Sequence, residues 1–145
     1  MKMFIMQGLP GSGKSTMAET IKRELQNEGY AVRIFSTDNF YMIDGVYVYN
    51  KDMASVNHFR NQFSCLSYFE ETPYRFIPMT VAIIDNTNIT NMEAAPYIWI
   101  AKKFGASIEI IRCWGKYKST HNVPEEIIEK MRERMEVIDV DRVIF

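Results

Sequence analysis

Short apolar runs alternate along this chain with longer stretches of helical periodicity. Four runs have the length and apolar character of buried strands, at residues 3–7, 31–35, 80–84 and 107–112. Four stretches with apolar positions three or four residues apart predict helices, at residues 14–28, 51–71, 91–104 and from 124 onward. This strict alternation predicts an α/β fold, in which right-handed crossovers join a mainly parallel central sheet flanked by helices.

Three details of the pattern go beyond this alternation. In the second predicted helix, the apolar residues of one face are Val56, Phe59, Phe63 and Leu66. Between the second strand and that helix lies an aromatic, irregular segment at residues 39–50, where Asp44 and Gly45 are a turn signal, so a small hairpin or loop is expected. The apolar tail from Val137 to Phe145 is expected to form a final edge strand or a packed extension.

The composition fits one globular domain over residues 1–145, with 47% hydrophobic and 24% charged residues. A formal net charge of −1 gives no basic excess for gripping long nucleic acids, although a protein that takes one strand end or a small molecule needs none. Cys65 and Cys113 fit no zinc or redox spacing, and we expect free thiols.

The segment before Gly8 is too short for a signal peptide, and no apolar run approaches the roughly 20 residues that span a bilayer. A cytoplasmic protein without membrane contact is therefore expected. The sequence carries no signal for a particular oligomeric state.

The first strand leads directly into the glycine-rich segment Gly8-Leu9-Pro10-Gly11-Ser12-Gly13-Lys14-Ser15-Thr16. This spacing of glycines, lysine and hydroxyl is typical of a P-loop, because glycine lets the backbone fold around a phosphate with its N–H groups pointing inward. The helix that follows adds the positive end of its dipole. We expect Lys14 to reach the terminal phosphates and Ser15 to ligate magnesium, so the segment predicts a site for ATP, or another nucleoside triphosphate, with Mg²⁺.

Two acidic residues follow predicted strands, at the edge where ligands of parallel sheets bind. Asp85 ends the run at residues 81–84, and a carboxylate there can hold a magnesium-bound water; the alternative is a strand-end turn with Asn86. Asp38 follows the second strand and can accept a proton from an acceptor hydroxyl; the alternative is a helix or turn cap.

The segment before the last predicted helix is basic, with Arg112, Lys116 and Lys118. It predicts a lid that closes over the phosphates and stabilises the charge of the transition state; a solvated charged loop is the alternative. His58 and His121 have no metal-ligand partner at short spacing, and we interpret both as ordinary hydrogen-bonded side chains.

At these positions the sequence resembles the polynucleotide-kinase branch of P-loop kinases, and most closely the kinase-like domain of the Nedd-four-binding protein family. The matching blocks are the P-loop; Phe35-Ser36-Thr37-Asp38; His58 with Asn61-Gln62; Ile83-Ile84-Asp85-Asn86-Thr87-Asn88 with Glu93 and Pro96-Tyr97; and, more weakly, His121 with Val123-Pro124, Ile128, Met131 and Arg134. Together these blocks span nearly the whole chain. The block beginning at Asp85 is much more specific than the P-loop, which many kinases share.

The resemblance implies a three-layer P-loop kinase fold and the role of general base for Asp38. It also implies an active-site or substrate-contacting role for Asp85, Asn86, Thr87 and Asn88. Polynucleotide kinases often carry an arginine three residues after the base, where this chain has Tyr41. The family's lid carries Arg-Asn before its His-Gly-Val, and here Lys118 is the candidate to replace that arginine.

Three functions remain open from the sequence. The leading one is an ATP- and Mg²⁺-dependent kinase of DNA or RNA 5′-hydroxyl ends, in which Lys14, Asp38 and either Lys118 or Arg112 act on the transferred group, with nucleic acid 5′ ends as partner. The second has the same chemistry with a nucleoside, nucleotide or other small metabolite as acceptor. The third is a nucleotide-binding regulatory or scaffold module with little transfer activity.

Overall fold

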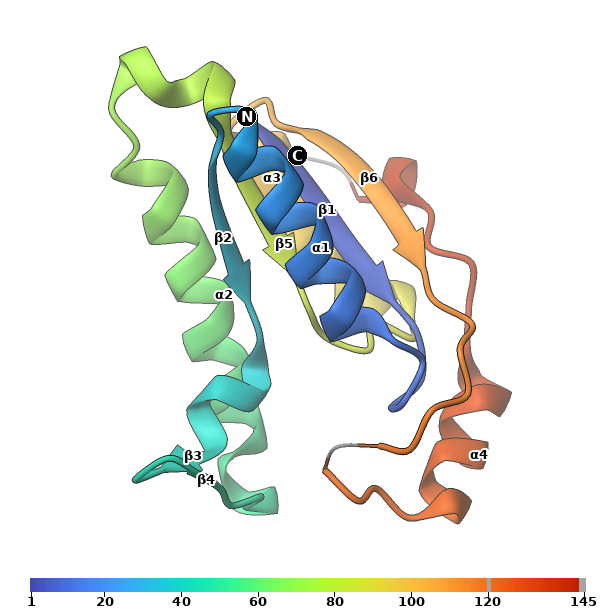
Figure 1. Ribbon diagram of the computed structural model, residues 1–145. Coiled ribbons are helices and arrows are strands. Elements are labelled where there is room, and N and C mark those ends of the chain that lie inside the picture. Colours follow the sequence, from blue (N-terminus) through green and yellow to red (C-terminus); the bar gives the residue numbers. More distant parts are fainter. Residues whose placement is uncertain (120, 144–145) are drawn as a thin grey trace.

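The most apolar runs of the chain form the centre of a parallel sheet (Figure 1). The structure, a computed structural model, describes residues 1–119 and 121–143. Across the sheet the strands follow the order β2 (Ala31–Phe35), β5 (Thr80–Ile84), β1 (Lys2–Gln7) and β6 (Ser107–Arg112). Every neighbouring pair in this sheet is parallel. The carboxyl ends of all these strands therefore meet at one edge.

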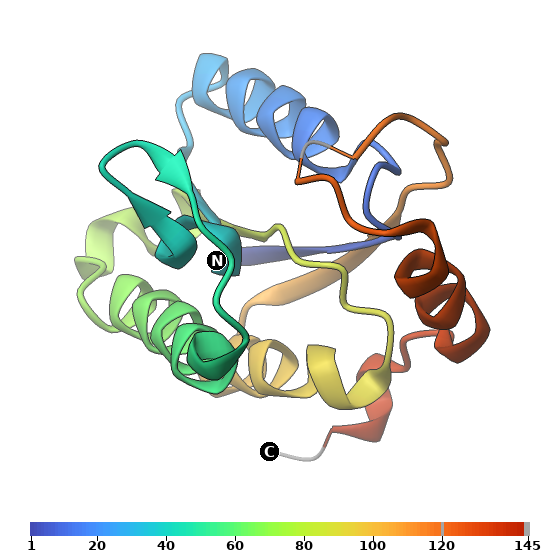
Figure 2. The same cartoon turned by 90° about the horizontal axis from the view of Figure 1, so that it is seen from below.

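Helices cover both faces of this sheet and make three layers. The helices are α1 (Lys14–Asn27), α2 (Ala54–Glu70), α3 (Asn91–Lys103) and α4 (Glu125–Arg134). Figure 2 shows α1 on one face and α2 with α3 on the other. The predicted fold class, with a mainly parallel central sheet between helices, is thus confirmed.

Each helical layer packs on its own set of strand side chains. Under α1, Phe4 and Ile83 belong to one buried cluster. On the opposite face, Ile5 and Ile84 belong to a larger cluster with residues of α2 and α3. Successive strand residues point to opposite faces, so continuous apolar runs such as 80–84 supply both layers at once.

The apolar face that the sequence shows in α2 is exposed at three of its four positions, with Leu66 as the half-buried one. Phe59 is 65% exposed and Phe63 is 58% exposed, and Val56 also faces outward. The residues of α2 that are buried are Asn57, Asn61, Cys65 and Phe69. Burying asparagine is tolerable here because its amide finds a partner: Asn61 donates to the hydroxyl of Tyr97 at 2.7 Å.

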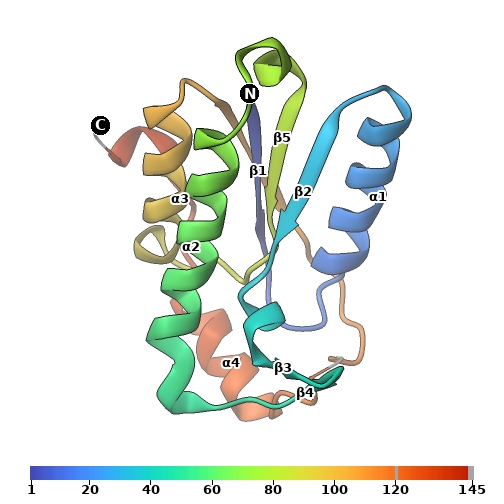
Figure 3. The ribbon, with the colours of Figure 1, turned by 90° about the vertical axis from the view of Figure 1, so that its left-hand side faces the viewer.

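The irregular aromatic segment contains the expected hairpin, formed by β3 (Met42–Ile43) and β4 (Val46–Tyr47) around Asp44 and Gly45. Both turn residues have positive φ, 50° and 79°, as the tight turn requires. Figure 3 shows this hairpin and α4 at the carboxyl edge of the sheet.

The tail forms a packed extension in its described part. Ile138 is buried in the larger cluster, and a short 3-10 helix, η4 (Val140–Arg142), follows it. The last residues of the expected tail, 144 and 145, lie outside the described residues. Within the described part of the chain, no helix combines the length and apolar character needed to cross a membrane.

Candidate active site

The glycine-rich segment forms the turn between β1 and α1. Its backbone has φ values of 79° at Gly11 and 92° at Gly13, a region that residues with a side chain rarely adopt. Gly13 is also the N-cap of α1 and makes no side-chain cap. The first amides of α1 therefore remain available to an anion at the positive end of the helix dipole.

Lys14 lies at the start of α1 with its side chain folded over this turn. The side chain is buried, and its Nζ donates to the backbone oxygen of Leu9 at 3.0 Å. Burial lowers the pKa of Lys14, while the nearby acidic groups, first of all Asp85, raise it. A phosphate group in the turn would supply the strong anionic partner that this buried ammonium otherwise lacks.

Ser15 and Asp85 meet across the end of the sheet. The Ser15 hydroxyl donates to Oδ2 of Asp85 at 2.7 Å. Oδ1 of Asp85 is buried and has no hydrogen-bond partner among the described residues. Burial raises the pKa of Asp85, against the opposing effects of the Ser15 hydrogen bond and the charge of Lys14. This pair of hard oxygen donors fits Mg²⁺, which at phosphate sites usually takes only one or two protein ligands.

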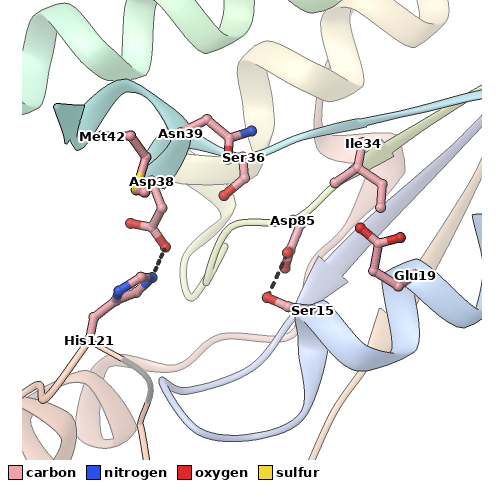
Figure 4. A pocket seen from close by; sticks show the side chains of 9 residues that line it. All are labelled: Ser15, Glu19, Ile34, Ser36, Asp38, Asn39, Met42, Asp85 and His121. Carbon is pink, nitrogen blue, oxygen red and sulfur yellow. Dashed lines mark hydrogen bonds and ion pairs between the residues drawn. The ribbon is translucent and has the colours of Figure 1, made fainter. Parts of the chain in front are cut away.

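A cleft of about 250 Å³ lies between this pair and the loop after β2. Figure 4 shows Ser15 and Asp85 on one side of it and Asp38 with His121 on the other. The residues lining the cleft are Ser15, Glu19, Ile34, Ser36, Asp38, Asn39, Met42, Asp85 and His121. Two sequence predictions, a metal-side carboxylate and an acceptor-side carboxylate, therefore fall in one cleft.

Asp38 stands in the 3-10 helix η1 (Thr37–Tyr41), which side chains from other elements hold in place. The backbone N–H of Thr37 donates to Oδ1 of Asn86 at 2.9 Å. The amide of Asn86 in turn donates to the hydroxyl of Tyr97 at 3.2 Å. Asn86 thus fixes the backbone immediately before Asp38.

Asn88 and Thr87 connect the same loop to the P-loop. Asn88 is buried with φ 44°, and its amide donates to the backbone oxygen of Met6 at 2.7 Å. The backbone N–H of Gly8 donates to the backbone oxygen of Thr87 at 3.1 Å. The side-chain amides of Asn86 and Asn88 thus make hydrogen bonds within the protein, a structural role that the sequence did not reveal. Direct contact of this block with substrate stays a prediction.

The basic segment after β6 lies directly on the P-loop. The backbone N–H of Gly115 donates to the backbone oxygen of Ser12 at 3.1 Å, and that of Tyr117 donates to the backbone oxygen of Gly11 at 2.7 Å. The Tyr117 backbone oxygen also lies where a side chain on Gly11 would have to go. Glycine at position 11 therefore serves both the turn and the close approach of this segment.

The cations of this segment differ in placement. Lys118 is exposed in the part that covers the P-loop. Lys116 lines a second, smaller cavity of about 100 Å³ beside Trp114. Arg112 donates from Nη2 to the backbone oxygen of Glu136 at 3.3 Å, so its guanidinium is directed to the segment after α4. Their role in a lid stays a prediction.

His121 and Tyr47, two ring side chains beside Asp38, had no functional assignment from the sequence. His121 Nε2 lies 3.4 Å from Oδ2 of Asp38, and the Tyr47 hydroxyl donates to Oδ1 at 3.4 Å. His58 Nδ1 lies 3.3 Å from the hydroxyl of Thr37. Each histidine thus lies beside a polar group, in line with the interpretation of both as ordinary polar side chains. No local pattern marked Tyr47, because only the return of the hairpin brings it to the carboxylate.

The phosphate-binding turn, the flanked parallel sheet and the carboxylates at its edge define a P-loop kinase-like domain. A family model described as an AAA domain (AAA_33) matches residues 3–138, and the chain belongs to this family. NEDD4-binding protein 2 of Homo sapiens is 31% identical over 140 residues, which cover 90% of this chain and 7% of that protein. The chain thus spans a small part of this relative's length.

Solved structures share the fold. Kti12 of Chaetomium thermophilum in complex with ADP-AlF3 matches with a TM-score of 0.67 and 15% identity, covering 93% of this chain and 80% of that chain. A mutant of the Mycobacterium tuberculosis APS kinase CysC matches with a TM-score of 0.56 and 17% identity, covering 91% of this chain and 92% of that chain.

Proposed function

We propose that this chain is an ATP- and Mg²⁺-dependent phosphotransferase, specifically a kinase of 5′-hydroxyl ends of nucleic acids. The observation that carries the proposal is the shared cleft, with Ser15 and Asp85 on one side and Asp38 on the other. Donor and acceptor groups need such a common space, because positioning supplies much of the rate of phosphoryl transfer.

On the donor side, the amides of the P-loop and the ammonium of Lys14 bind the phosphates of ATP. Ser15 and Asp85 would hold Mg²⁺, which would supply positive charge against the phosphates. The ADP-AlF3 of the Kti12 complex supports a nucleotide as the ligand of this fold. Lys118, which lies in the segment over the P-loop, is our candidate for closing on the transferred group; Arg112 would first have to leave the backbone oxygen of Glu136.

On the acceptor side, Asp38 accepts the proton of the attacking hydroxyl. The resemblance of the blocks at Asp38 and Asp85 to those of polynucleotide kinases favours a 5′-hydroxyl as that acceptor. A cytoplasmic location, where ATP is available, belongs to the same proposal.

A small hydroxyl compound is the second candidate acceptor, and one observation favours it. Among the described residues that line the cleft, none is arginine or lysine. Tyr41, at the position where polynucleotide kinases often have an arginine, is buried and cannot bind an acceptor phosphate as that arginine does.

Transfer of radiolabelled phosphate from ATP to 5′-hydroxyl oligonucleotides, and in parallel to nucleosides and nucleotides, tests both candidates. We expect labelling of oligonucleotides by the wild type and a loss of about 10²-fold or more in Asp38→Asn. Glu70→Gln, at the exposed far end of α2, is the matched charge control and should label like the wild type.

The outcomes separate the alternatives. Labelling of small acceptors alone would replace the polynucleotide proposal with the second candidate. ATP binding without transfer to any acceptor would leave a nucleotide-binding regulatory module. Full activity of Asp38→Asn would remove Asp38 from the mechanism.

A further inference from the structure

Asp38 is held from two sides by residues that come from separate parts of the chain. His121 precedes α4 and places Nε2 3.4 Å from Oδ2. Tyr47 ends the hairpin and donates its hydroxyl to Oδ1 at 3.4 Å. The rings of Tyr47 and His121 also stack, with centroids 3.8 Å apart and planes 23° from parallel. Each member of this cluster therefore contacts the other two.

Stability alone explains this cluster poorly. The side chains of His121 and Asp38 are 32% and 50% exposed, and even a charged pair at such a site typically contributes only about 0–1 kcal/mol. Both residues instead face the cleft that also holds Ser15 and Asp85 (Figure 4). The cluster thus lies where an acceptor hydroxyl would meet the donor phosphate.

We propose that His121 is the final acceptor of the hydroxyl proton, which it takes from Asp38, and that Tyr47 is the positioning residue for both. This inference rests on the proposed phosphotransfer. The hydroxyl oxygen uses its O–H electron pair to form the new bond to the γ-phosphorus of the nucleoside triphosphate. The bond from that phosphorus to the bridging oxygen breaks, and its electron pair leaves with the nucleoside diphosphate.

The proton passes from the hydroxyl to the Asp38 carboxylate and then to the lone pair on Nε2 of His121, whose neutral ring carries its own proton on Nδ1 in this step. The imidazolium formed in this way later releases a proton to water. Imidazole is a stronger base than carboxylate, so the transfer to His121 returns Asp38 to its charged form. The distance of 3.4 Å is long for a hydrogen bond, as is common at catalytic contacts before the substrates bind.

Tyr47 is suited to hold the pair without joining the transfer. Burial, followed by the nearby charge of Asp38, raises the pKa of Tyr47 to about 12. Its hydroxyl therefore stays a donor to Oδ1 throughout the neutral range, while its ring keeps the imidazole stacked. The other charged groups nearby are Glu19 and Asp85 across the cleft, and Lys14, whose charge interacts with that of Asp38.

Variants that keep the stacked rings test this inference. His121→Phe retains a ring against Tyr47 but removes the nitrogen, and Tyr47→Phe removes only the hydroxyl. Tyr49→Phe, an exposed neighbour in the same segment, is the matched control. We expect His121→Phe to lower kcat about 10²-fold with the KM for ATP unchanged, and to alter the acid side of the pH profile of kcat, because the proton then has no acceptor beyond Asp38. Tyr47→Phe should lower kcat less and leave the acid side of the pH profile as in the wild type, and Tyr49→Phe should behave like the wild type in both respects.

The result that overturns the inference is His121→Phe with the kcat and pH profile of the wild type. Thermal melts and a second variant, His121→Gln, check for a folding defect. A misfolded variant would melt at a lower temperature and show a raised KM for ATP. A second readout needs no substrate: in NMR spectra, Tyr47→Leu should move the His121 ring protons downfield because the stacked ring is lost, and unmoved protons would refute the cluster itself. Absence of transfer by the wild type to every acceptor would refute the proposed function together with the relay, whereas active wild type with equally active His121→Phe would refute the relay alone.

Discussion

Asp85 and Lys14 have opposite charges and are both buried at the end of the sheet. The pKa of each side chain is shifted by this burial. Burial raises the pKa of Asp85 and lowers the pKa of Lys14, even though each charge favours the other. Without ligands, the neutral forms of both groups are therefore favoured relative to the unfolded chain. A site of this kind gains stability when phosphate and Mg²⁺ arrive.

Asp85→Asn should therefore raise the melting temperature of the ligand-free protein at pH 7. The folded protein holds the Asp85 proton more tightly than the unfolded chain, because its folded-state pKa is raised. This contribution to stability is fully present below the ordinary carboxyl range near pH 4 and is lost as pH rises through the raised pKa. The gain from the substitution should accordingly shrink toward zero below about pH 4.

Calorimetric melts at both pH values, with Glu70→Gln as the control for loss of an exposed carboxylate, measure this difference. A lower melting temperature of Asp85→Asn at pH 7 would mean that its attraction to Lys14 outweighs its burial.

At the scale of elements, the sequence pattern predicted the alternating strands and helices well, but it did not indicate which face of α2 turns inward. Apolar runs and the P-loop spacing are local signals, so β1, β5 and the start of α1 could be recognised directly. The inward face of α2 depends instead on Asn61, whose amide meets the hydroxyl of Tyr97, a partner 36 residues away in the sequence. Periodicity of apolar residues carries no information about such a contact.

The same distinction separates the two halves of the candidate site. Apart from Asp85, which follows β5, the donor residues lie in one continuous segment whose composition follows from phosphate binding, so the sequence could point to them directly. The surroundings of Asp38 depend on the return of the hairpin to Tyr47 and on the approach of His121 from the segment before α4. These contacts are set by tertiary structure, so sequence spacing could not reveal them.

Two substitutions in α2 test which of its faces packs against the rest of the molecule. We expect loss of a buried asparagine to reduce the free energy of unfolding more than loss of an exposed phenylalanine. Asn61→Ala leaves the buried hydroxyl of Tyr97 without this donor and should reduce the free energy of unfolding by about 1–3 kcal/mol. Phe59→Ser, at a side chain that is 65% exposed, should change it by no more than about 0.5 kcal/mol. Urea unfolding of both variants measures these values, and a larger loss for Phe59→Ser would show that the outer face of α2 is covered in solution.

At the scale of the whole molecule, the P-loop is the point where the separate layers are joined. Gly8 bonds to the loop after β5 through Thr87, and Gly11 bonds to the segment after β6 through Tyr117. Lys14 begins α1, which covers the opposite face of the sheet from α2 and α3. The turn thus joins β1, α1 and the segments that follow β5 and β6, so the binding energy of a ligand held by it should stabilise these parts together.

ATP with Mg²⁺ at 100 times its dissociation constant should accordingly add about 2.7 kcal/mol to the free energy of unfolding, as expected for a ligand that binds only the folded chain. Lys14→Ala should lose most of this gain because it removes the cation that faces the phosphates. Removing Mg²⁺ with EDTA should reduce the gain in the wild type, and Asp85→Asn should make the remaining gain insensitive to EDTA. Thermal melts across an ATP titration, with Glu70→Gln as the control, measure all of these effects. Equal stabilisation of wild type and Lys14→Ala would mean that ATP binds outside the P-loop, and the donor half of the proposed mechanism would then be wrong.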